Sequence, residues 1–220
     1  IGKSSFYDLS TLYNVNDLIT YKESNNNYLL RDLIICGIVG FFYGLVFYRY
    51  SIALESAQIL IGSVEYPSNS LILKQHTSLW NIQSQFLALL LYLGFTEQIL
   101  SMFWGGLEGT ISFVSLYFCA SVFVDRSRKL LAFVLIIVLG TFYYKHGMNY
   151  PIYLVSGGHA YGAIALSLSI LSIALFSRGN YRSSGILLGA LPSIHLVLGA
   201  WTIFITILVL VFFIRNKINI

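Results

Sequence analysis

The sequence predicts an all-α fold, a polytopic bundle of transmembrane helices, from its composition and its charge pattern. Hydrophobic residues make up 57% of the 220 residues and charged residues only 10%, against roughly 25% charged residues in ordinary soluble domains. The apolar residues form long runs, and Lys and Arg cluster between these runs, as in the cytoplasmic loops of membrane proteins. We therefore expect an integral, multi-pass membrane protein.

Charge and cysteine usage exclude other classes. The net charge of +4 would favour nucleic acid in a soluble protein, but here basic residues stand at the ends of apolar runs and set orientation instead. We predict no nucleic-acid partner. Cys36 and Cys119 lie inside apolar runs, where cysteine acts as a small buried hydrophobe.

Two regions follow from the pattern. Residues 1–31 are polar and mixed in charge, which predicts a cytoplasmic N-terminal tail. Residues 32–220 form the predicted transmembrane domain of about six to eight spans. Because the chain begins with Ile and ends just after a span, we expect it to be part of a longer protein, truncated at the C-terminus.

The first span is predicted at Leu33–Tyr48. It is shorter than the roughly 20 residues that cross a bilayer, so its ends must recruit Asp32 and the stretch Arg49–Ile52 by snorkelling. Gly40 and Gly44 form a GxxxG pair, which lets another helix approach closely.

An interfacial amphipathic helix is predicted at Ser51–Glu65, in the first outer loop. Its polar positions recur at helical spacing: Glu55, Gln58, Gly62 and Glu65. A polar loop, Tyr66–Thr77, follows it.

The middle of the chain leaves two topologies open. Apolar runs at Leu79–Gly94 and Gly109–Val124 flank the mixed stretch Phe95–Glu108. The basic cluster Asp125–Lys129 marks the cytoplasm, so an odd number of crossings separates it from the outer loop. Either Leu79–Glu108 stays on the outer side as interfacial or re-entrant helices, or it crosses twice.

Beyond the basic cluster, Leu130–Tyr144 is predicted to cross outward. The outer loop Lys145–Gly158 follows, and His159–Phe176 crosses back. Arg178 and Arg182 indicate a short cytoplasmic turn.

The last apolar stretch, Gly185–Ile214, is too long for one span and is interrupted at Leu191–His195. Since basic residues follow it, two spans are required, and the first should stop at Pro192. Gly185 and Gly189 form a second GxxxG face.

Candidate acidic site residues lie on the predicted outer side. Glu55 stands just after the first span, where partial desolvation would make it a general base or a metal ligand. A solvated charge that terminates the span is the alternative. Glu65 is either its partner or an ordinary surface carboxylate.

Basic groups and histidines gather on the same side. Lys74 and His76 either contact an anionic phosphate headgroup or hydrate their loop. His159 follows two glycines at a helix start, an arrangement that favours anions. His195 lies at the helix break, where it either serves a function or satisfies backbone groups freed by Pro192.

Metal chemistry has no local motif here. The spacings HxH, HxxxH, HExxH and CxxC do not occur, so a divalent metal would require ligands from separate helices, namely Glu55, His76, His159 and His195. A bis-histidine haem is disfavoured, because the histidines lie at span ends.

The order of these features resembles the N-terminal half of the GT-C superfamily of integral membrane glycosyltransferases. The passages that carry the resemblance are Glu65–Trp80, Leu93–Glu97, Arg178–Gly179, Gly185–Gly189 and Pro192–His195. These enzymes move a sugar from a polyprenyl-phosphate carrier to an acceptor on the outer face of the membrane.

The resemblance implies roles for the outer residues. By position, Glu55 would deprotonate the acceptor hydroxyl, and Lys74, His76, His159 and His195 would stabilise the departing lipid phosphate. The partners would be membrane lipid and the lipid-linked sugar donor. The family often has Asp at the first position, and several members have an acidic residue where this chain has His159.

Two other functions remain open. A secondary transporter or channel also uses broken helices and histidines, but no internal repeat is found and no charge is predicted mid-span, which favours the enzyme. A non-catalytic assembly subunit would leave the outer polar residues without a shared pocket.

Overall fold

The computed structural model describes residues 15–46, 52–78, 80–124, 130–131, 133–134 and 161–218. Within these ranges every regular element is a helix, which confirms the predicted all-α class. The helices are α1 (Val15–Val46), α2 (Ile52–Leu60), α3 (Leu71–Ser78), α4 (Ile82–Tyr92), α5 (Glu97–Phe123), α7 (Tyr161–Ser177), α8 (Tyr181–Ile194) and α9 (Leu196–Ile218).

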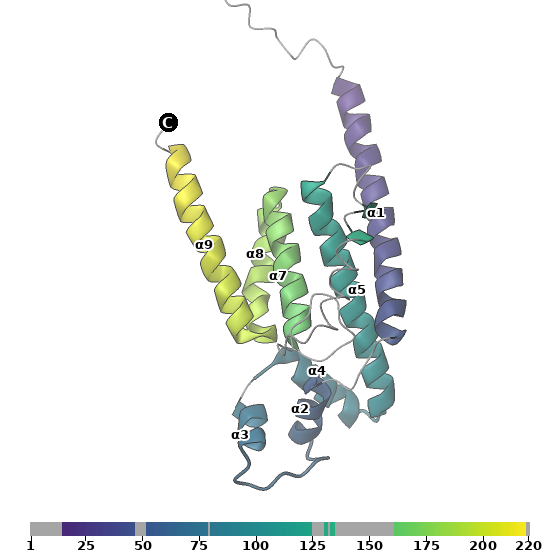
Figure 1. Ribbon diagram of the computed structural model, residues 1–220, viewed down its shortest axis with the longest axis vertical. Coiled ribbons are helices and arrows are strands. Elements are labelled where there is room, and N and C mark those ends of the chain that lie inside the picture. The colour runs from purple at the N-terminus through teal and green to yellow at the C-terminus, as the bar shows by residue number, and fades with distance from the viewer. Residues whose placement is uncertain are drawn as a thin grey trace, which may run out of the picture.

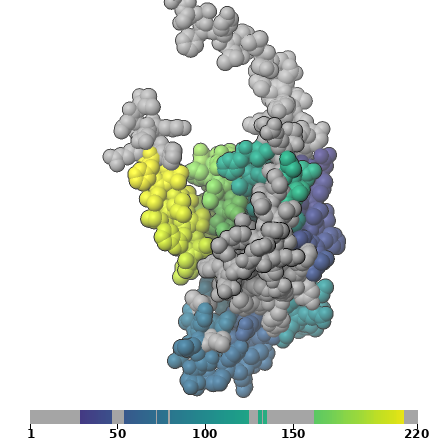
Figure 2. All heavy atoms as spheres, viewed as in Figure 1, coloured from purple at the N-terminus to yellow at the C-terminus, as the bar shows by residue number. Residues whose placement is uncertain are grey.

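The long helices stand side by side and the short ones gather at one end (Figure 1). Helices α1, α5, α7, α8 and α9 run along the long axis of the molecule. Helices α2, α3 and α4 form a group, here called the cap (residues 52–92), at the end where α1 finishes and α9 begins. Figure 2 shows the cap in blue, below the bundle.

Two of the described helices are long and apolar enough to cross a membrane, namely Leu29–Val46 of α1 and all of α5. The apolar stretches Gly162–Ser177 and Leu196–Phe212 are shorter than the roughly 20 residues that a span needs. The described residues therefore do not confirm the prediction of six to eight spans.

Helix α1 is longer than the predicted first span. It begins at Val15 and runs without a break to Val46, so the second half of the predicted tail belongs to the same helix. No Pro or Gly interrupts residues 15–36, and the Asn run at 25–27 only weakens helix propensity.

The predicted close approach at Gly40 and Gly44 is confirmed, and its partner is a second GxxxG pair on α5. A Cβ atom added to Gly44 would lie 2.0 Å from the carbonyl oxygen of Gly105, and one added to Gly40 would lie 2.4 Å from that of Gly109. Only glycine permits backbones to meet this closely. These contacts fix where α1 crosses α5.

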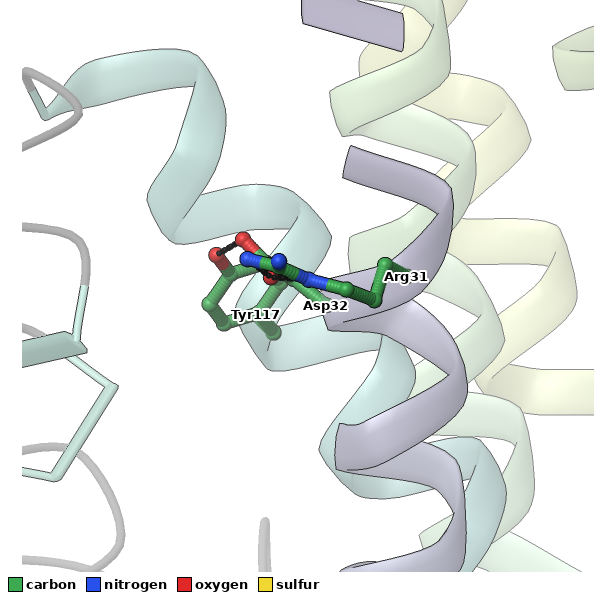
Figure 3. A network of polar contacts seen from close by, with 3 residues as sticks. All are labelled: Arg31, Asp32 and Tyr117. Carbon is green, nitrogen blue, oxygen red and sulfur yellow. Dashed lines mark hydrogen bonds and ion pairs between the residues drawn. The ribbon is translucent and has the colours of Figure 1, made fainter. Parts of the chain in front are cut away.

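A polar network joins α1 and α5 nearer the other end of α1 (Figure 3). The Tyr117 hydroxyl donates to Asp32 Oδ2 at 2.8 Å, and the Arg31 guanidinium pairs with Asp32 Oδ1 at 3.3 Å. Asp32, predicted to snorkel, is thus held by a side chain of the neighbouring helix.

Helix α5 shows how the middle segment is folded. The mixed stretch Phe95–Glu108 and the second apolar run are not separate elements, because one continuous helix of 27 residues spans Glu97–Phe123. The Thr96 hydroxyl starts it by accepting from the amide of Ile99. Helix α4 stays in the cap, so this segment runs the length of the bundle once.

Helix α7 is tied to three neighbours through buried serines. The Ser167 hydroxyl bonds that of Ser112 on α5 at 2.9 Å, and the Ser169 hydroxyl bonds that of Thr202 on α9 at 3.0 Å. The Ser172 hydroxyl bonds that of Ser184 on α8 at 3.0 Å. Small hydroxyl residues permit close packing and satisfy each other where no water is present.

The predicted turn between Arg178 and Arg182 is confirmed. Gly179 has φ of +79°, a left-handed conformation that ends α7. The Arg178 guanidinium donates to the carbonyl of Ser121 at 3.1 Å and lies 4.4 Å from the ring centroid of Phe118. Burial lowers the pKa of Arg178 from its ordinary value.

The second predicted glycine face is not a close contact. A Cβ atom on Gly185 or Gly189 would have no atom within 4 Å in the described structure. The GxxxG spacing alone does not supply a partner helix, and here α8 packs through other faces, including buried Ser184 and Leu191.

Candidate functional site

Helix α2 ends earlier than predicted. Gly62 has φ of +73°, its amide bonds to the carbonyl of Ile59, and the amide of Ser63 bonds to that of Gln58. This left-handed glycine cap stops the helix. Glu65 therefore lies in an exposed loop, and the prediction that it shares a helix face with Glu55 is wrong.

Glu55 is half-buried and has a different partner. The hydroxyl of Tyr66 donates to Glu55 Oε1 at 2.8 Å. That hydrogen bond, followed by burial and the adjacent negative charge, raises the pKa of the Tyr66 phenol. The carboxylate is thus held in place by the loop that follows α2.

The segment predicted as a polar loop contains α3. The Ser70 hydroxyl accepts from the amide of Leu73 at the start of this helix. Lys74 is exposed on it, whereas His76 is half-buried. Ser56 Oγ of α2 lies 2.5 Å from His76 Nδ1, and within the described residues His76 Nε2 makes no hydrogen bond.

Asn81 links the cap to the bundle. Its side-chain oxygen accepts from the amide of Gln83 at 2.8 Å and so caps α4. Its amide nitrogen donates to the carbonyl of Ile194, at the end of α8. An asparagine before an apolar run is a recognisable cap, but its contact 113 residues away has no sequence signal.

The predicted break between α8 and α9 is confirmed at His195. Helix α8 continues two residues past Pro192 and ends at Ile194, because the His195 amide still bonds to the carbonyl of Leu191 at 2.9 Å. A Cβ atom on Gly199 would lie 2.5 Å from the nitrogen of Pro192. The two helices therefore meet backbone to backbone at a sharp corner.

His195 caps α9 through its ring. Its Nδ1 accepts from the amide of Leu198 at 3.3 Å, so in the neutral ring the hydrogen must be on Nε2. Burial lowers the pKa of His195 from its ordinary value. At neutral pH this histidine therefore acts as a neutral hydrogen-bond donor and not as a cation.

A small polar cavity lies between the cap and this corner. Its volume is about 150 Å³, and it is lined by Ser56, His76, Trp80, Asn81, Ser84, His195, Leu196 and Val197. Two predicted site residues, far apart in the sequence, thus meet in one cavity. A shallow apolar groove of about 430 Å³ continues from it along α9, lined by Leu196, Val197, Ala200, Trp201 and Phe204.

The other predicted site residues do not line this cavity. Glu55 is turned to Tyr66, and Glu65 and Lys74 are exposed elsewhere on the cap. His159 lies outside the described residues. Among the described residues no three His, Cys, Asp or Glu side chains gather as a metal-binding set.

The sequence interpretation missed Glu108. The sequence pattern places it in a mixed stretch between two spans and predicts no charge mid-span. In the structure it lies in the middle of α5 with 1% of its surface exposed, so that expectation is wrong. The signal was present: a lone acidic residue lies between Gly106 and Gly109 in a largely apolar stretch that contains no proline.

Comparison with known proteins does not identify a family. No protein-family model, curated protein or solved structure matches the chain.

Proposed function

We propose that this chain is a multi-pass membrane protein that binds a lipid-linked phosphate and transfers the sugar it carries to an acceptor. One observation carries the proposal. The polar cavity with His76 and His195 and the apolar groove on α9 share Leu196 and Val197. A polar pocket joined to an open apolar surface fits an anionic headgroup on a long hydrocarbon chain.

The surface of the bundle supports a membrane location. Large apolar side chains are exposed along α1 and α9, among them Ile38, Phe42, Trp201 and Phe204. Soluble monomers rarely expose apolar patches this extensive. In this arrangement the cap lies at one membrane interface, and the Arg178 turn and the C-terminal end of α9 lie at the other.

Within the cavity the two histidines have matched roles. Each ring is fixed through Nδ1, His76 by Ser56 and His195 by the amide of Leu198. Both rings line the cavity, and we assign to them the hydrogen bonds with the phosphate oxygens. A hydrogen-bond donor at this oxygen stabilises the charge that develops as the bond between the phosphate and the anomeric carbon breaks.

Glu55 is the proposed base for the acceptor. It would take the proton of the acceptor hydroxyl as the oxygen bonds to the anomeric carbon. Because Glu55 directly precedes Ser56 on α2, about 100° around the helix, the acceptor must approach from the Tyr66 side. The donor and acceptor would thus reach α2 on adjacent faces.

The test uses the full chain in nanodiscs with polyprenyl phosphate as the probe. Asn in place of His195 keeps a capping oxygen near the Nδ1 position but removes the Nε2 donor. We expect His195→Asn and His76→Asn each to weaken binding at least fivefold, with exposed Lys74→Gln as the control. Equal binding of polyprenol and polyprenyl phosphate would overturn the headgroup assignment.

The catalytic role is tested separately. Glu55→Gln should bind the lipid phosphate normally but lose transfer from a polyprenyl-phosphate sugar. Retained transfer would remove Glu55 from the mechanism without affecting the binding site.

Glu108 favours a second candidate, a proton-coupled transporter. An ionisable residue in the middle of a spanning helix marks a transport or proton pathway more often than a structural position. Substrate-driven proton uptake into proteoliposomes, lost in Glu108→Gln, would support it over the transferase.

A further inference from the structure

We propose that Glu108 is a proton-binding site inside the helical bundle and holds a proton in the resting protein. The carboxyl group lies in the middle of α5, away from the cavity that contains His76 and His195. The inference therefore stands apart from the proposed binding of a lipid phosphate.

Burial without a partner is the first observation. The Glu108 side chain is 1% exposed, and within the described part of the chain neither carboxyl oxygen has a hydrogen-bond partner. A carboxylate in such a place would carry an uncompensated charge in an apolar environment, which is strongly unfavourable. Either a cation or a proton must neutralise it.

The second observation is a row of polar groups on the same face of α5. On α5, three further buried side chains have a polar atom without a hydrogen-bond partner among the described residues: Ser101, Trp104 and Ser115. At 3.6 residues per turn these three and Glu108 fall within a sector of about 60° and extend over about 21 Å. Ser112, one turn beyond Glu108, bonds Ser167 of α7, so this face of α5 is turned to α7.

No described group around Glu108 offers a compensating charge. Helix α7 has no titratable side chain in residues 162–177. The titratable or charged side chains described on the other elements packed against α5 are Arg31, Asp32, Cys36 and Tyr43 on α1, Glu55 on α2 and Tyr92 on α4. Arg31 pairs with Asp32, and Arg178 binds Ser121 at the end of α5.

The burial of Glu108 determines whether a metal ion, a basic side chain or a proton neutralises its carboxylate. Among the described residues, Glu108 belongs to no group of three or more His, Cys, Asp or Glu side chains that could hold a metal ion. A side chain that is 1% exposed is also closed to a basic residue from a partner chain. A proton needs neither additional ligands nor a cavity, because it converts the carboxylate to a neutral acid.

Infrared spectroscopy of the whole chain in an ester-free detergent tests the proposal. At pH 7 the wild type should show the C=O stretching band of a protonated carboxylic acid, whereas ordinary glutamates are ionised at this pH. The band should be lost in Glu108→Gln, which has the same shape and no charge. It should shift in D2O, because a bound proton exchanges with solvent.

Two controls make the result decisive. Asp32→Asn, which alters a carboxylate bound to Tyr117, should leave the band unchanged. Wild-type protein labelled with ¹³C at the glutamate side-chain carboxyl should show the same band at lower frequency, so the test does not depend on folding of the variant. Absence of an acid band at pH 7, or a band retained in Glu108→Gln, would overturn the proposal.

Discussion

Ser56 Oγ lies 2.5 Å from Nδ1 of His76 and joins two cap helices that the sequence does not place together. The serine is buried in α2 and the histidine is half-buried in α3. Through this bond α2 sets the orientation of a ring that lines the candidate binding cavity.

Removing that hydroxyl should loosen the cap. Ser56→Ala deprives His76 of a partner in a partly buried place, which destabilises the fold by about 1–3 kcal/mol. Ser78→Ala is the matched control, since its hydroxyl is exposed and donates only to the carbonyl of Gln75. Thermal unfolding of both variants in detergent measures the difference, and equal melting temperatures would contradict the bond.

The crossing of α1 and α5 should tolerate no side chain. Gly44→Ala places a Cβ atom 2.0 Å from the Gly105 oxygen, so the helices must separate, with a loss of about 1–3 kcal/mol. Gly185→Ala has no atom within 4 Å and should instead stabilise α8 by up to about 1 kcal/mol. Equal changes in the free energy of unfolding for the two variants would show that α1 and α5 cross at another position.

His195 should make stability depend on pH. Its pKa is lowered in the folded protein from an ordinary value of 6.5, so below that value the unfolded chain binds more protons than the folded chain. Stability should therefore fall as pH drops from about 7.5 through 6.5 and should level off below the folded pKa.

The control for that pH dependence is His195→Asn, which keeps a capping oxygen and does not titrate. Unfolding of both proteins by urea, from pH 5 to pH 8, should show a smaller slope in the variant. Identical slopes of the unfolding free energy against pH would show that groups other than His195 cause the pH dependence.

The hydrogen bond between Tyr66 and Glu55 can be tested by measuring the pKa of the Tyr66 phenol. The hydrogen bond raises the Tyr66 pKa above its ordinary value of 10.0. Alkaline absorbance titration, taken as the difference between the wild type and Tyr66→Phe, should show this raised midpoint. In Glu55→Gln the Tyr66 midpoint, obtained from the same kind of difference, should return toward 10. A midpoint equal to that in the wild type would show that the two side chains do not meet.

Local signals predicted much of the fold. The Gly40–Gly44 pair, the Arg178 turn and the break at His195 each depend on residues within a few positions of one another, and the structure confirms them. The inclusion of most of Phe95–Glu108 in the long helix α5 could not be predicted in this way. Its polar residues lower the mean hydropathy of the segment, although in the helix they are buried against α7 or lie near the cap.

The candidate site was predictable only in part. His76 and His195 are recognisable in the sequence because each lies at an irregular position, and the structure brings them to one cavity. Their meeting depends on Asn81 binding Ile194 and on Gly199 packing against Pro192, contacts between segments that no spacing rule connects. Glu65 was misplaced because the left-handed turn at Gly62 outweighed the helical periodicity.

The three serine pairs of α7 have a consequence for how the protein is made. Ribosomes release α1 and α5 first, and their glycine contact can form as soon as both exist. Helix α7 then finds a partner for Ser167 already in place, whereas Ser172 and Ser169 must await α8 and α9. The packing of α7 is thus completed by segments synthesised after it. In a chain stopped at residue 180 the Ser172 hydroxyl would lack its partner, whereas Ser169 would keep its bond to the carbonyl of Ala165.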